Sequence, residues 1–306
     1  MPRPRVIIDC DPGSDDALAI VLAAAHAEVV GITTVAGNVG LEHTTRNALR
    51  VCELLGLDVP VHAGADGPLV GTRVDAAEVH GADGLAGSGL PPASGSPASH
   101  DAVRFLIDTV RAERNLWLIV IGPMTNVALA LRQAPDLADR LAGISFMGGG
   151  RHGGNATAAA EFNLLADPEA AAVVLASGAR LLMAGLDLTH QAPVDDDRQA
   201  ELAAIDRPAA RMAAGLIAEF LDRIEALGLP RHGHLHDPCA VAAVTHPALV
   251  THDLLPVAVE TVGAHTRGMT VVDERGGHDS AEPNVRVGRT IDGDALWRLL
   301  VDALSA

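Results

Sequence analysis

The sequence predicts an α/β fold with a mostly parallel central sheet, helices on both of its faces and a small extra β region near the C-terminus. Short apolar runs typical of buried strands alternate with helical segments along most of the chain. Such alternation is typical of parallel sheets, because a helix usually connects each strand to the next. The 306 residues, 48% of them hydrophobic, suffice for one large core. We therefore expect a single domain over residues 1–306.

The first two thirds of the chain contain the clearest elements. Apolar runs of strand length predict strands at 6–8, 29–35, 59–62, 116–121, 144–147 and 181–184. Segments with helical periodicity predict helices at 15–26, 42–55, 98–114, 127–133 and 168–177. The irregular stretches 64–89 and 91–99 are longer than an ordinary connection, which indicates a functional lid or a flexible connection.

The last third adds helices and the late β region. Helical patterns predict helices at 196–204, 209–227, 238–245 and 294–304. The third of these follows Asp237 and begins with Pro238, an acidic N-cap and a proline at the first helical position. Apolar runs at 257–262, 269–273 and 285–290 predict the strands of the late β region.

Composition excludes several functional classes. The net charge is −17 at pH 7, so binding to nucleic acid or to an anionic membrane would act against the overall field. Cys10, Cys52 and Cys239 are an odd set without CxxC spacing, which argues against a disulfide framework or a zinc site. The sequence has no signal-peptide pattern and no apolar run of the roughly 20 residues that span a bilayer. We expect a cytoplasmic protein that binds neither nucleic acid nor membrane.

Four carboxylates crowd the end of the first predicted strand, namely Asp9, Asp11, Asp15 and Asp16. Like charges so close together raise one another's pKa values unless a cation neutralises them. Oxygen ligands suit Ca²⁺ or Mg²⁺ better than zinc or copper. A plainer interpretation is that some of these acids belong to a solvated turn and others to the first turn of a helix, where the dipole favours them. Four acids around the Pro12-Gly13 turn favour the metal site.

Other candidate site residues also lie at the ends of predicted strands. Asn38 comes after the strand 29–35 and Thr125 after the strand 116–121, while Met147 closes the strand 144–147. Ligands of open α/β sheets bind at the carboxyl ends of the strands. We therefore expect these residues to converge on the same rim as the acidic group.

The motifs formed by these residues resemble those of the inosine-uridine preferring nucleoside hydrolases, a family of Ca²⁺-dependent ribohydrolases with a mostly parallel α/β fold. The resemblance spans about residues 6–239. The motifs, in the family's order, are Asp9-x-Asp11-Pro12-Gly13-x-Asp15-Asp16-Ala17, Val35-Ala36-Gly37-Asn38, His80-Gly81-x-Asp83-Gly84, Gly122-Pro123-Met124-Thr125-Asn126, Met147-Gly148-Gly149-Gly150, Asn155 with Glu161-Phe162-Asn163, and His236-Asp237-Pro238.

The resemblance implies hydrolysis of the N-glycosidic bond of ribonucleosides to free base and ribose. It implies Ca²⁺ as cofactor, with ligands from Asp11, Asp16, Asp237 and the backbone carbonyl of Thr125. Asp11 would also be the general base towards a calcium-bound water, because calcium acidifies water less than zinc does. Asp9 would orient the loop through hydrogen bonds rather than bind metal.

The resemblance also implies the substrate contacts. The residues expected to bind the substrate are Asp15, Asn38, His80, Met147, Asn155, Glu161 and Asn163. Their acids and amide oxygens would stabilise an oxocarbenium-like transition state. His236 would protonate the leaving base or hydrogen-bond to it. Membership of the family further implies a homodimer or a homotetramer.

Simpler interpretations exist for single residues. Glu161 and Asn163 fit helix caps, Met147 fits a core residue, and His80 fits a solvated loop. His232 and His234 alternate with His236, which we interpret as a mobile loop rather than a metal cluster.

The resemblance also bears on the base preference. Relatives that favour pyrimidine nucleosides often place tyrosines over the base, whereas purine-dedicated relatives tend to stack the base between tryptophans. The chain has no Tyr, and its two tryptophans fall in a predicted strand and in the last helix rather than near a base pocket. His80 and His236 favour an inosine-uridine or pyrimidine-type preference over a strictly purine one.

Two other functions share parts of the pattern. A HAD-type phosphohydrolase also begins with a strand, an Asp-x-Asp motif and a metal, but it needs a phosphate-binding Lys and this chain has none. A non-catalytic, metal-dependent nucleoside-binding or sensor protein would keep the same ligands. The presence of Asp11 together with the ribose-binding residues favours the enzyme.

Overall fold

The computed structural model describes residues 3–276 and 280–306 and contains an eight-stranded sheet, in which seven strands run parallel and the edge strand β9 runs antiparallel. Its strands, in spatial order, are β3 (Val61–Ala63), β2 (Glu28–Thr34), β1 (Arg5–Cys10), β4 (Leu116–Val120), β5 (Gly143–Met147), β6 (Leu181–Ala184), β12 (Val285–Ile291) and β9 (Val250–Leu255). The predicted fold class is confirmed.

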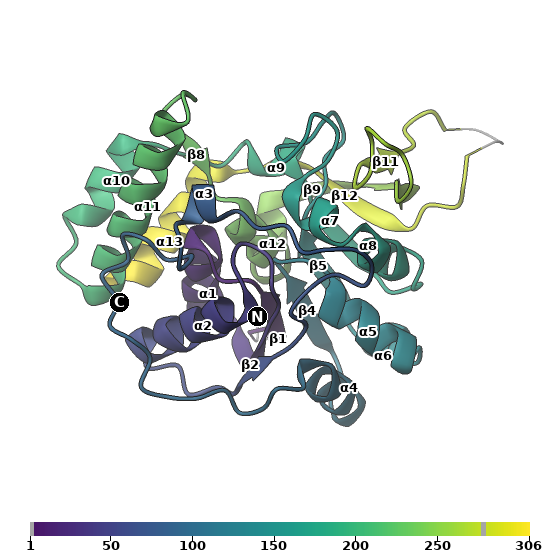
Figure 1. Cartoon of the computed structure of the whole chain (residues 1–306), viewed down its shortest axis with the longest axis horizontal. Helices are drawn as coiled ribbons and strands as arrows, with labels where there is room; N and C mark the ends of the chain where they lie inside the picture. Colours follow the sequence, from purple (N-terminus) through teal and green to yellow (C-terminus); the bar gives the residue numbers. More distant parts are fainter. Residues whose placement is uncertain (1–2, 277–279) are drawn as a thin grey trace.

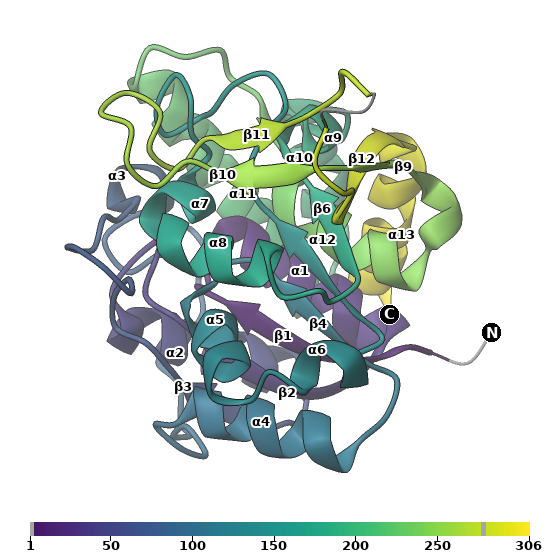
Figure 2. The same ribbon diagram turned by 90° about the vertical axis from the view of Figure 1, so that its right-hand side faces the viewer.

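Helices cover both faces of the sheet (Figures 1 and 2). One face carries α1 (Ser14–His26), α2 (Leu41–Leu55), α10 (Asp196–Ala203), α11 (Pro208–Ala226), α12 (His236–Thr245) and α13 (Gly293–Ser305). The other carries α4 (Ala102–Ala112), α5 (Thr125–Gln133), α6 (Leu137–Arg140) and α8 (Pro168–Leu175). Short helical turns are α3 (Ala77–His80), α7 (Phe162–Ala166), α9 (Leu186–Thr189) and the 3₁₀ turn Pro247–Leu249.

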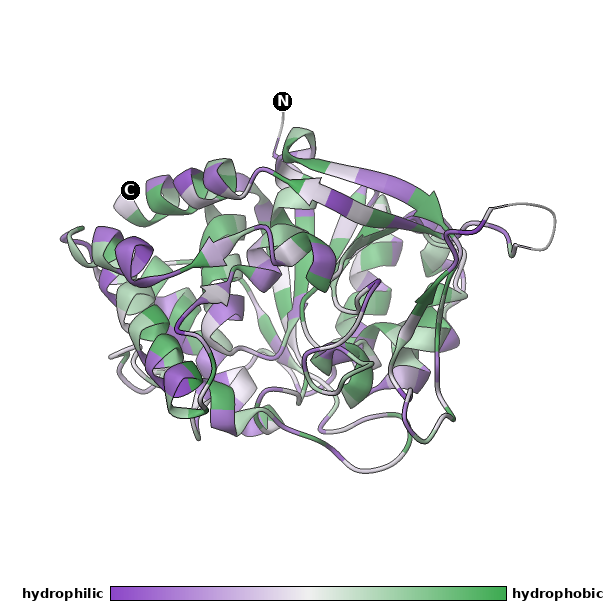
Figure 3. Cartoon of the chain, turned by 90° about the horizontal axis from the view of Figure 1, so that it is seen from above, coloured by the Kyte–Doolittle hydropathy of each residue, from purple (hydrophilic) through white to green (hydrophobic). Residues whose placement is uncertain are grey.

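The sheet separates two hydrophobic cores. Along β1, Val6 and Ile8 pack into the core on the α1 side, whereas Ile7 packs into the core on the α5 side. This alternation follows from the two-residue period of a strand, and a strand buried on both faces must be apolar throughout. The helices carry hydrophobic and hydrophilic residues in turn, whereas the strands between them are mostly hydrophobic (Figure 3).

The late β region divides between two sheets. β10 (Val257–Val259) and β11 (Thr270–Val272) form the small extra ribbon that the sequence predicts. β12 instead joins the main sheet beside β6, and β9, which the pattern does not reveal, pairs with it at the edge. A second short ribbon pairs β7 (Pro193–Val194) with β8 (Gly233–His234).

The order of the strands positions the site. Connections run outward from β1 to β2 and β3 on one side and from β4 to β5 and β6 on the other, so the order reverses between β1 and β4. At such a point the loops after the two strands turn apart and leave a crevice at their carboxyl ends. No helix in the described ranges combines the length and the apolar character that crossing a bilayer requires.

Candidate active site

The loop between β1 and α1 folds around Asp16. Its carboxylate accepts hydrogen bonds from the backbone N–H groups of Asp11 (3.1 Å) and Gly13 (2.9 Å). Asp16 therefore satisfies donors at the start of α1, where the helix dipole also favours a negative charge. The side-chain amide of Asn38 donates to the same carboxylate (3.1 Å) and to the carbonyl of Asp11 (3.1 Å). The polar residue after β2 thus holds the acidic loop in place.

Asp11 lies at the bottom of the crevice and is fully buried. Its Oδ2 accepts a hydrogen bond from the backbone N–H of Asn38 (2.7 Å), whereas Oδ1 has no partner among the described residues. Glycines leave room for the carboxylate, because a Cβ on Gly37 would lie 2.1 Å from Oδ2 and one on Gly122 2.5 Å from Oδ1. An orphaned buried carboxylate oxygen indicates that a cation completes the site.

Three more carboxylates lie close by. Asp15, Asp16 and Asp237 each offer an oxygen within 4.8 Å of those of the other two. Burial and the neighbouring carboxylates raise the pKa of Asp16 to about 7. The same causes raise the pKa values of Asp11 and Asp237 well above their usual range. These groups cannot all be ionised in a buried space without a counter-charge. The donor set therefore fits a metal ion, and its oxygens suit a hard divalent cation.

Asp9 and Thr125 are held by hydrogen bonds to residues outside this group. Asp9 Oδ1 accepts hydrogen bonds from Thr33 Oγ1 (2.6 Å) and from the side-chain amide of Asn126 (2.8 Å), and burial raises the pKa of Asp9 to about 6. The hydroxyl of Thr125, the first residue of α5, donates to Asp167 (2.7 Å). Asp9 therefore connects β1 to β2 and α5, and neither Asp9 nor Thr125 contributes to the cavity wall.

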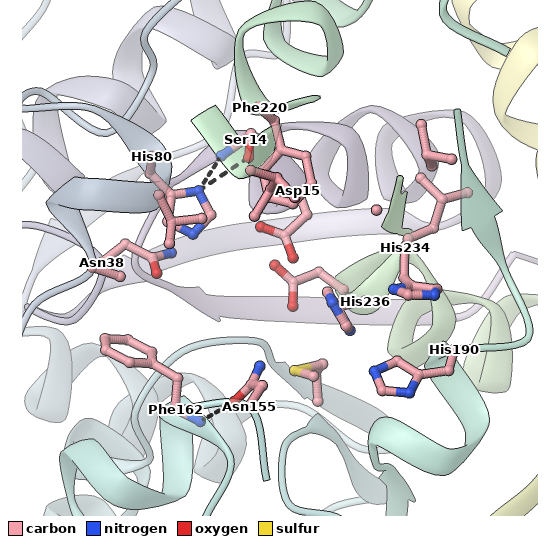
Figure 4. A pocket seen from close by; sticks show the side chains of 18 of the residues that line it. Ser14, Asp15, Asn38, His80, Asn155, Phe162, His190, Phe220, His234 and His236 are labelled. Carbon is pink, nitrogen blue, oxygen red and sulfur yellow. Dashed lines mark hydrogen bonds between the residues drawn. The ribbon is translucent and has the colours of Figure 1, made fainter. Parts of the chain in front are cut away.

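A cavity of about 530 Å³ opens above the acidic group. The predicted site residues that line it are Asp15, Asn38, His80, Met147, Asn155, Glu161, Asn163, His236 and Asp237. Figure 4 shows Asp15 and His236 near its centre, with Asn38 and His80 to one side. Asp9, Asp11, Asp16 and Thr125 are not among the residues that line it. The structure thus brings the predicted residues from six separate motifs to one place.

Backbone hydrogen bonds hold Glu161 in the wall of the cavity. Glu161 is the N-cap of α7, and its carboxylate accepts from the N–H groups of Gly149 (3.0 Å), Asn163 (2.9 Å) and Leu164 (3.2 Å). The simpler interpretation of Glu161 as a cap is therefore right, yet the same side chain lines the cavity. Burial raises its pKa to about 7.

In each of two asparagines, protein hydrogen bonds use one atom of the side-chain amide and leave the other atom for a ligand. Asn163 donates to the carbonyls of Ile121 (3.1 Å) and Met147 (3.3 Å), which leaves its amide oxygen for a ligand. Asn155 accepts from the N–H of Phe162 (3.0 Å), which leaves its amide nitrogen. The cavity therefore offers both a donor and an acceptor on this side, as recognition of a polyhydroxyl group requires.

Two predicted histidines are fixed by hydroxyl groups. His236 Nδ1 lies 2.8 Å from Thr189 Oγ1, and burial lowers the pKa of His236 to about 4. His80 Nδ1 lies 3.0 Å from Ser14 Oγ, and burial lowers the pKa of His80 as well. His80 ends the short helix α3 within the long irregular segment, so it belongs to the cavity wall rather than to a solvated loop.

Three lining residues were not predicted to belong to the site. His190, His234 and Phe220 line the cavity (Figure 4). His234 lies in β8 and not in a mobile loop. The alternation of His232, His234 and His236 is the one signal in the sequence that marks this region.

The fold and the site together define a metal-assisted hydrolase, with an acidic metal site beneath a cavity that presents amides, acids and imidazoles. The sequence model of the family described as "Inosine-uridine preferring nucleoside hydrolase" matches residues 6–298, and the chain belongs to this family. The predicted family is confirmed, and the phosphohydrolase alternative is set aside.

Individual relatives agree with this assignment. The chain is 40% identical to the inosine-uridine preferring nucleoside hydrolase of Leishmania major, over 99% of this chain and 98% of the relative. It is 42% identical to the pyrimidine-specific ribonucleoside hydrolase RihA of Escherichia coli O1:K1 / APEC, over 98% and 97%. Its structure is similar to that of the purine-preferring ribonucleoside hydrolase from Gardnerella vaginalis, with a TM-score of 0.91, 32% identity and 98% of each chain covered. The protein is a nucleoside hydrolase and hydrolyses ribonucleosides.

Proposed function

We propose that the enzyme has an inosine-uridine or pyrimidine-type substrate preference. We propose further that it uses Ca²⁺ as cofactor and Asp11 as general base. The observation that carries this proposal is the orphaned Oδ1 of Asp11, buried beneath the cavity beside the group formed by Asp15, Asp16 and Asp237. Because this buried oxygen accepts no hydrogen bond within the described residues, a bound cation would give it the partner that it lacks.

Asp11, Asp16, Asp237 and the backbone carbonyl of Thr125 would hold the cation. A bound Ca²⁺ would supply the positive charge that keeps these carboxylates ionised, and it would attract the hydroxyl oxygens of the ribose. Asp15 is only partly buried and lines the cavity, so we assign it to a ribose hydroxyl.

Asp11 would act on the attacking water. As the water oxygen forms a bond to the anomeric carbon, Asp11 accepts the proton that the water loses. The bond between the anomeric carbon and the base nitrogen breaks, and its electron pair goes to the base, which takes up one proton. Nucleoside and water thus become ribose and free base.

The cavity wall would stabilise the charge that develops on the sugar. The anomeric carbon becomes positive before the new bond is complete. Asp15 brings negative charge to this region, Glu161 does the same once a bound cation keeps it ionised, and the amide oxygen of Asn163 adds a dipole of the same sense. Groups that are already oriented before the reaction stabilise a transition state most effectively, and backbone hydrogen bonds orient Glu161 here.

His236 would assist the departure of the base. Thr189 anchors its Nδ1, which leaves Nε2 for the cavity. Since burial lowers its pKa to about 4, the ring is neutral near pH 7. The Thr189 hydroxyl lies nearer to Nδ1 (2.8 Å) than to the carbonyl of Leu186 (3.4 Å), so we let it donate to Nδ1 and assign the ring proton to Nε2. From Nε2 the ring donates a hydrogen bond to the leaving base as negative charge accumulates there.

The residues that line the cavity support the proposed base preference. Trp117 lies in β4 and Trp297 in α13, and neither lines the cavity. The cavity therefore has no tryptophan clamp of the kind expected for a purine-dedicated enzyme. The names of the Leishmania major and Escherichia coli relatives, inosine-uridine preferring and pyrimidine-specific, support the same direction, and both are more similar in sequence (40% and 42% identity) than the purine-preferring enzyme from Gardnerella vaginalis (32%).

We propose further that the enzyme is a homodimer or homotetramer of single-domain subunits in the cytoplasm. The three cysteines are free and buried, which suits a reducing compartment. Light scattering would give the number of subunits, and a single cooperative unfolding transition would support one domain.

The first test measures ribose release from inosine, uridine, cytidine, adenosine and guanosine, with Ca²⁺ and then with a chelator. Release that is fastest from uridine or inosine and that the chelator abolishes would support the proposal. Release that persists after removal of all divalent cations would contradict the role of calcium, and fastest release from adenosine or guanosine would contradict the base preference.

A further inference from the structure

An apolar surface forms one wall of the cavity. Ile217, Phe220 and Ile224 lie three and four residues apart on α11 and therefore share one face of the helix, which lines the cavity. Leu227 and Leu229 continue this surface outward and are 50% and 54% exposed. Phe220 lies across the cavity from Asn155 and Phe162 (Figure 4). Because this surface extends from inside the cavity to solvent, it leaves room for an apolar group larger than a bare ring edge.

A pair of imidazoles forms a second, polar wall. His234 lies opposite Pro193 in the ribbon of β7 and β8, and the next N–H, of Leu235, donates to the carbonyl of Ala192 (2.8 Å). The backbone of His234 is therefore held on both sides. The ring of His190, which follows α9, lies with its centroid 4.4 Å from that of His234 and tilted by 34°. The pair thus presents one fixed surface to the cavity.

The nitrogens of this pair are free to bind a ligand. Within residues 3–276 and 280–306, no protein group hydrogen-bonds to a ring nitrogen of His190 or His234. Burial and the neighbouring imidazoles lower the pKa of His234 to about 4, and burial lowers that of His190. Each ring is therefore neutral near pH 7 and offers one donor and one acceptor.

The two walls match a pyrimidine better than a purine. A pyrimidine joined to ribose through N1 has all its polar atoms at positions 2, 3 and 4, and its C5–C6 edge carries only hydrogen. A purine joined through N9 has an acceptor nitrogen on each side, N3 and N7. One of these would face the apolar surface without a partner, and an unpaired buried acceptor weakens binding.

We propose that the His190–His234 pair binds the polar edge of a pyrimidine base while the α11 surface receives its C5–C6 edge. The enzyme therefore accepts ribonucleosides whose pyrimidine carries an apolar group at C5. This inference rests on the proposed hydrolysis at the same site and goes beyond it, since it assigns two specificity-determining histidines and a substrate class.

The substrate test compares uridine, 5-methyluridine, 5-hydroxymethyluridine and inosine by ribose release from the calcium-loaded enzyme. We expect kcat/KM for 5-methyluridine within about 3-fold of that for uridine, and a value about 10-fold lower for the hydroxymethyl compound, mainly through KM. Equal values for the methyl and hydroxymethyl compounds would overturn the apolar contact. Release from inosine alone would overturn this inference but leave the proposed hydrolysis intact, and no release from any nucleoside would overturn both.

Variants test the two walls separately. Ile224→Gln should lower kcat/KM for 5-methyluridine about 10-fold more than that for uridine, with Leu254→Gln, exposed on β9, as the control. His234→Phe keeps a ring but no hydrogen bond and should raise KM for uridine about 10- to 100-fold, whereas His234→Asn should recover part of the loss. His100→Phe, exposed before α4, serves as the matched control. A wild-type KM for uridine in a folded His234→Phe enzyme would overturn the role of the imidazoles.

Discussion

The acidic end of the cavity and the end to which we assign the base, called the base-facing end, are built in different ways. Asp11, Asp16 and Glu161 are buried and accept hydrogen bonds from backbone N–H groups. Asp16 and Glu161 accept from residues two or three positions away in the sequence, and Asp11 accepts from Asn38, which follows the neighbouring strand β2. Phe220 and His234 instead reach the cavity from α11 and β8, and exposed leucines border them. The acidic end follows from local geometry at the ends of parallel strands, whereas the base-facing end depends on how distant segments pack.

The difference between the two ends has a functional consequence. The chemistry on the sugar is the same for every ribonucleoside, so it suits residues that the strand ends and the backbone hold rigidly. The base varies from substrate to substrate, so it suits a wall whose side chains can change without disturbing the sheet. We expect substitutions at the acidic end to change the rate for all substrates and substitutions at the base-facing end to change the order of substrates.

The largest effect should come from Asp11→Asn. The amide keeps the size of the side chain but cannot accept the proton of the attacking water, so kcat should fall by about 10³-fold or more for every nucleoside. Initial rates of ribose release measure this. Asp101→Asn, at the N-cap of α4, should leave kcat unchanged. A loss of kcat for nucleosides of one base alone would contradict the distinction between the acidic end and the base-facing end.

Removal of the proposed calcium ion should make stability depend on pH. Without the cation, burial holds the pKa values of Asp16 and Glu161 at about 7, above the roughly 4 of the unfolded chain. The native state then binds more protons than the unfolded state, so this contribution to stability is complete below about pH 4 and is lost as the pH rises through 7. Bound Ca²⁺ should cancel the loss.

Thermal unfolding at pH 5 and pH 8, with calcium or with a chelator, measures this dependence. Calcium should raise Tm by about 5 °C more at pH 8 than at pH 5. Potassium at matched ionic strength is the control. An equal increase at both pH values would show that the buried acids do not bind the cation.

The smallest effect should come from Thr189→Val. The substitution keeps the shape of a fully buried residue but removes the hydroxyl that anchors His236 Nδ1. Loss of one such hydrogen bond is worth about 1 kcal/mol, so kcat/KM should fall about 5- to 10-fold, and the fall should differ between bases according to how much help each needs in leaving.

Kinetics with uridine and inosine measure this effect. Thr245→Val, at the far end of α12, removes a hydroxyl away from the cavity and should leave the kinetics unchanged. An identical fall for all bases would place Thr189 and His236 with the acidic end rather than with the base-facing end.

The sequence by itself determined the fold class, the family and the acidic loop. Asp11 and Asp16 lie in one short strand–turn–helix segment, so their proximity follows from neighbouring residues, and the order of apolar runs is sufficient to place Asn38 and Met147 at the same rim. Each of these residues follows or ends a buried strand, and the carboxyl ends of parallel strands meet at one edge.

Only the tertiary structure decided the base-facing wall and the last strands of the sheet. His190 and His234 meet because β7 pairs with β8, and nothing near either residue in the sequence indicates that pairing. In the same way, β12 extends the main sheet because its backbone pairs with β6 and β9. β9 lies at an edge and carries polar residues, so its pattern is weak. Contacts between distant segments depend on backbone hydrogen bonds and shape, which the periodicity of a single segment does not encode.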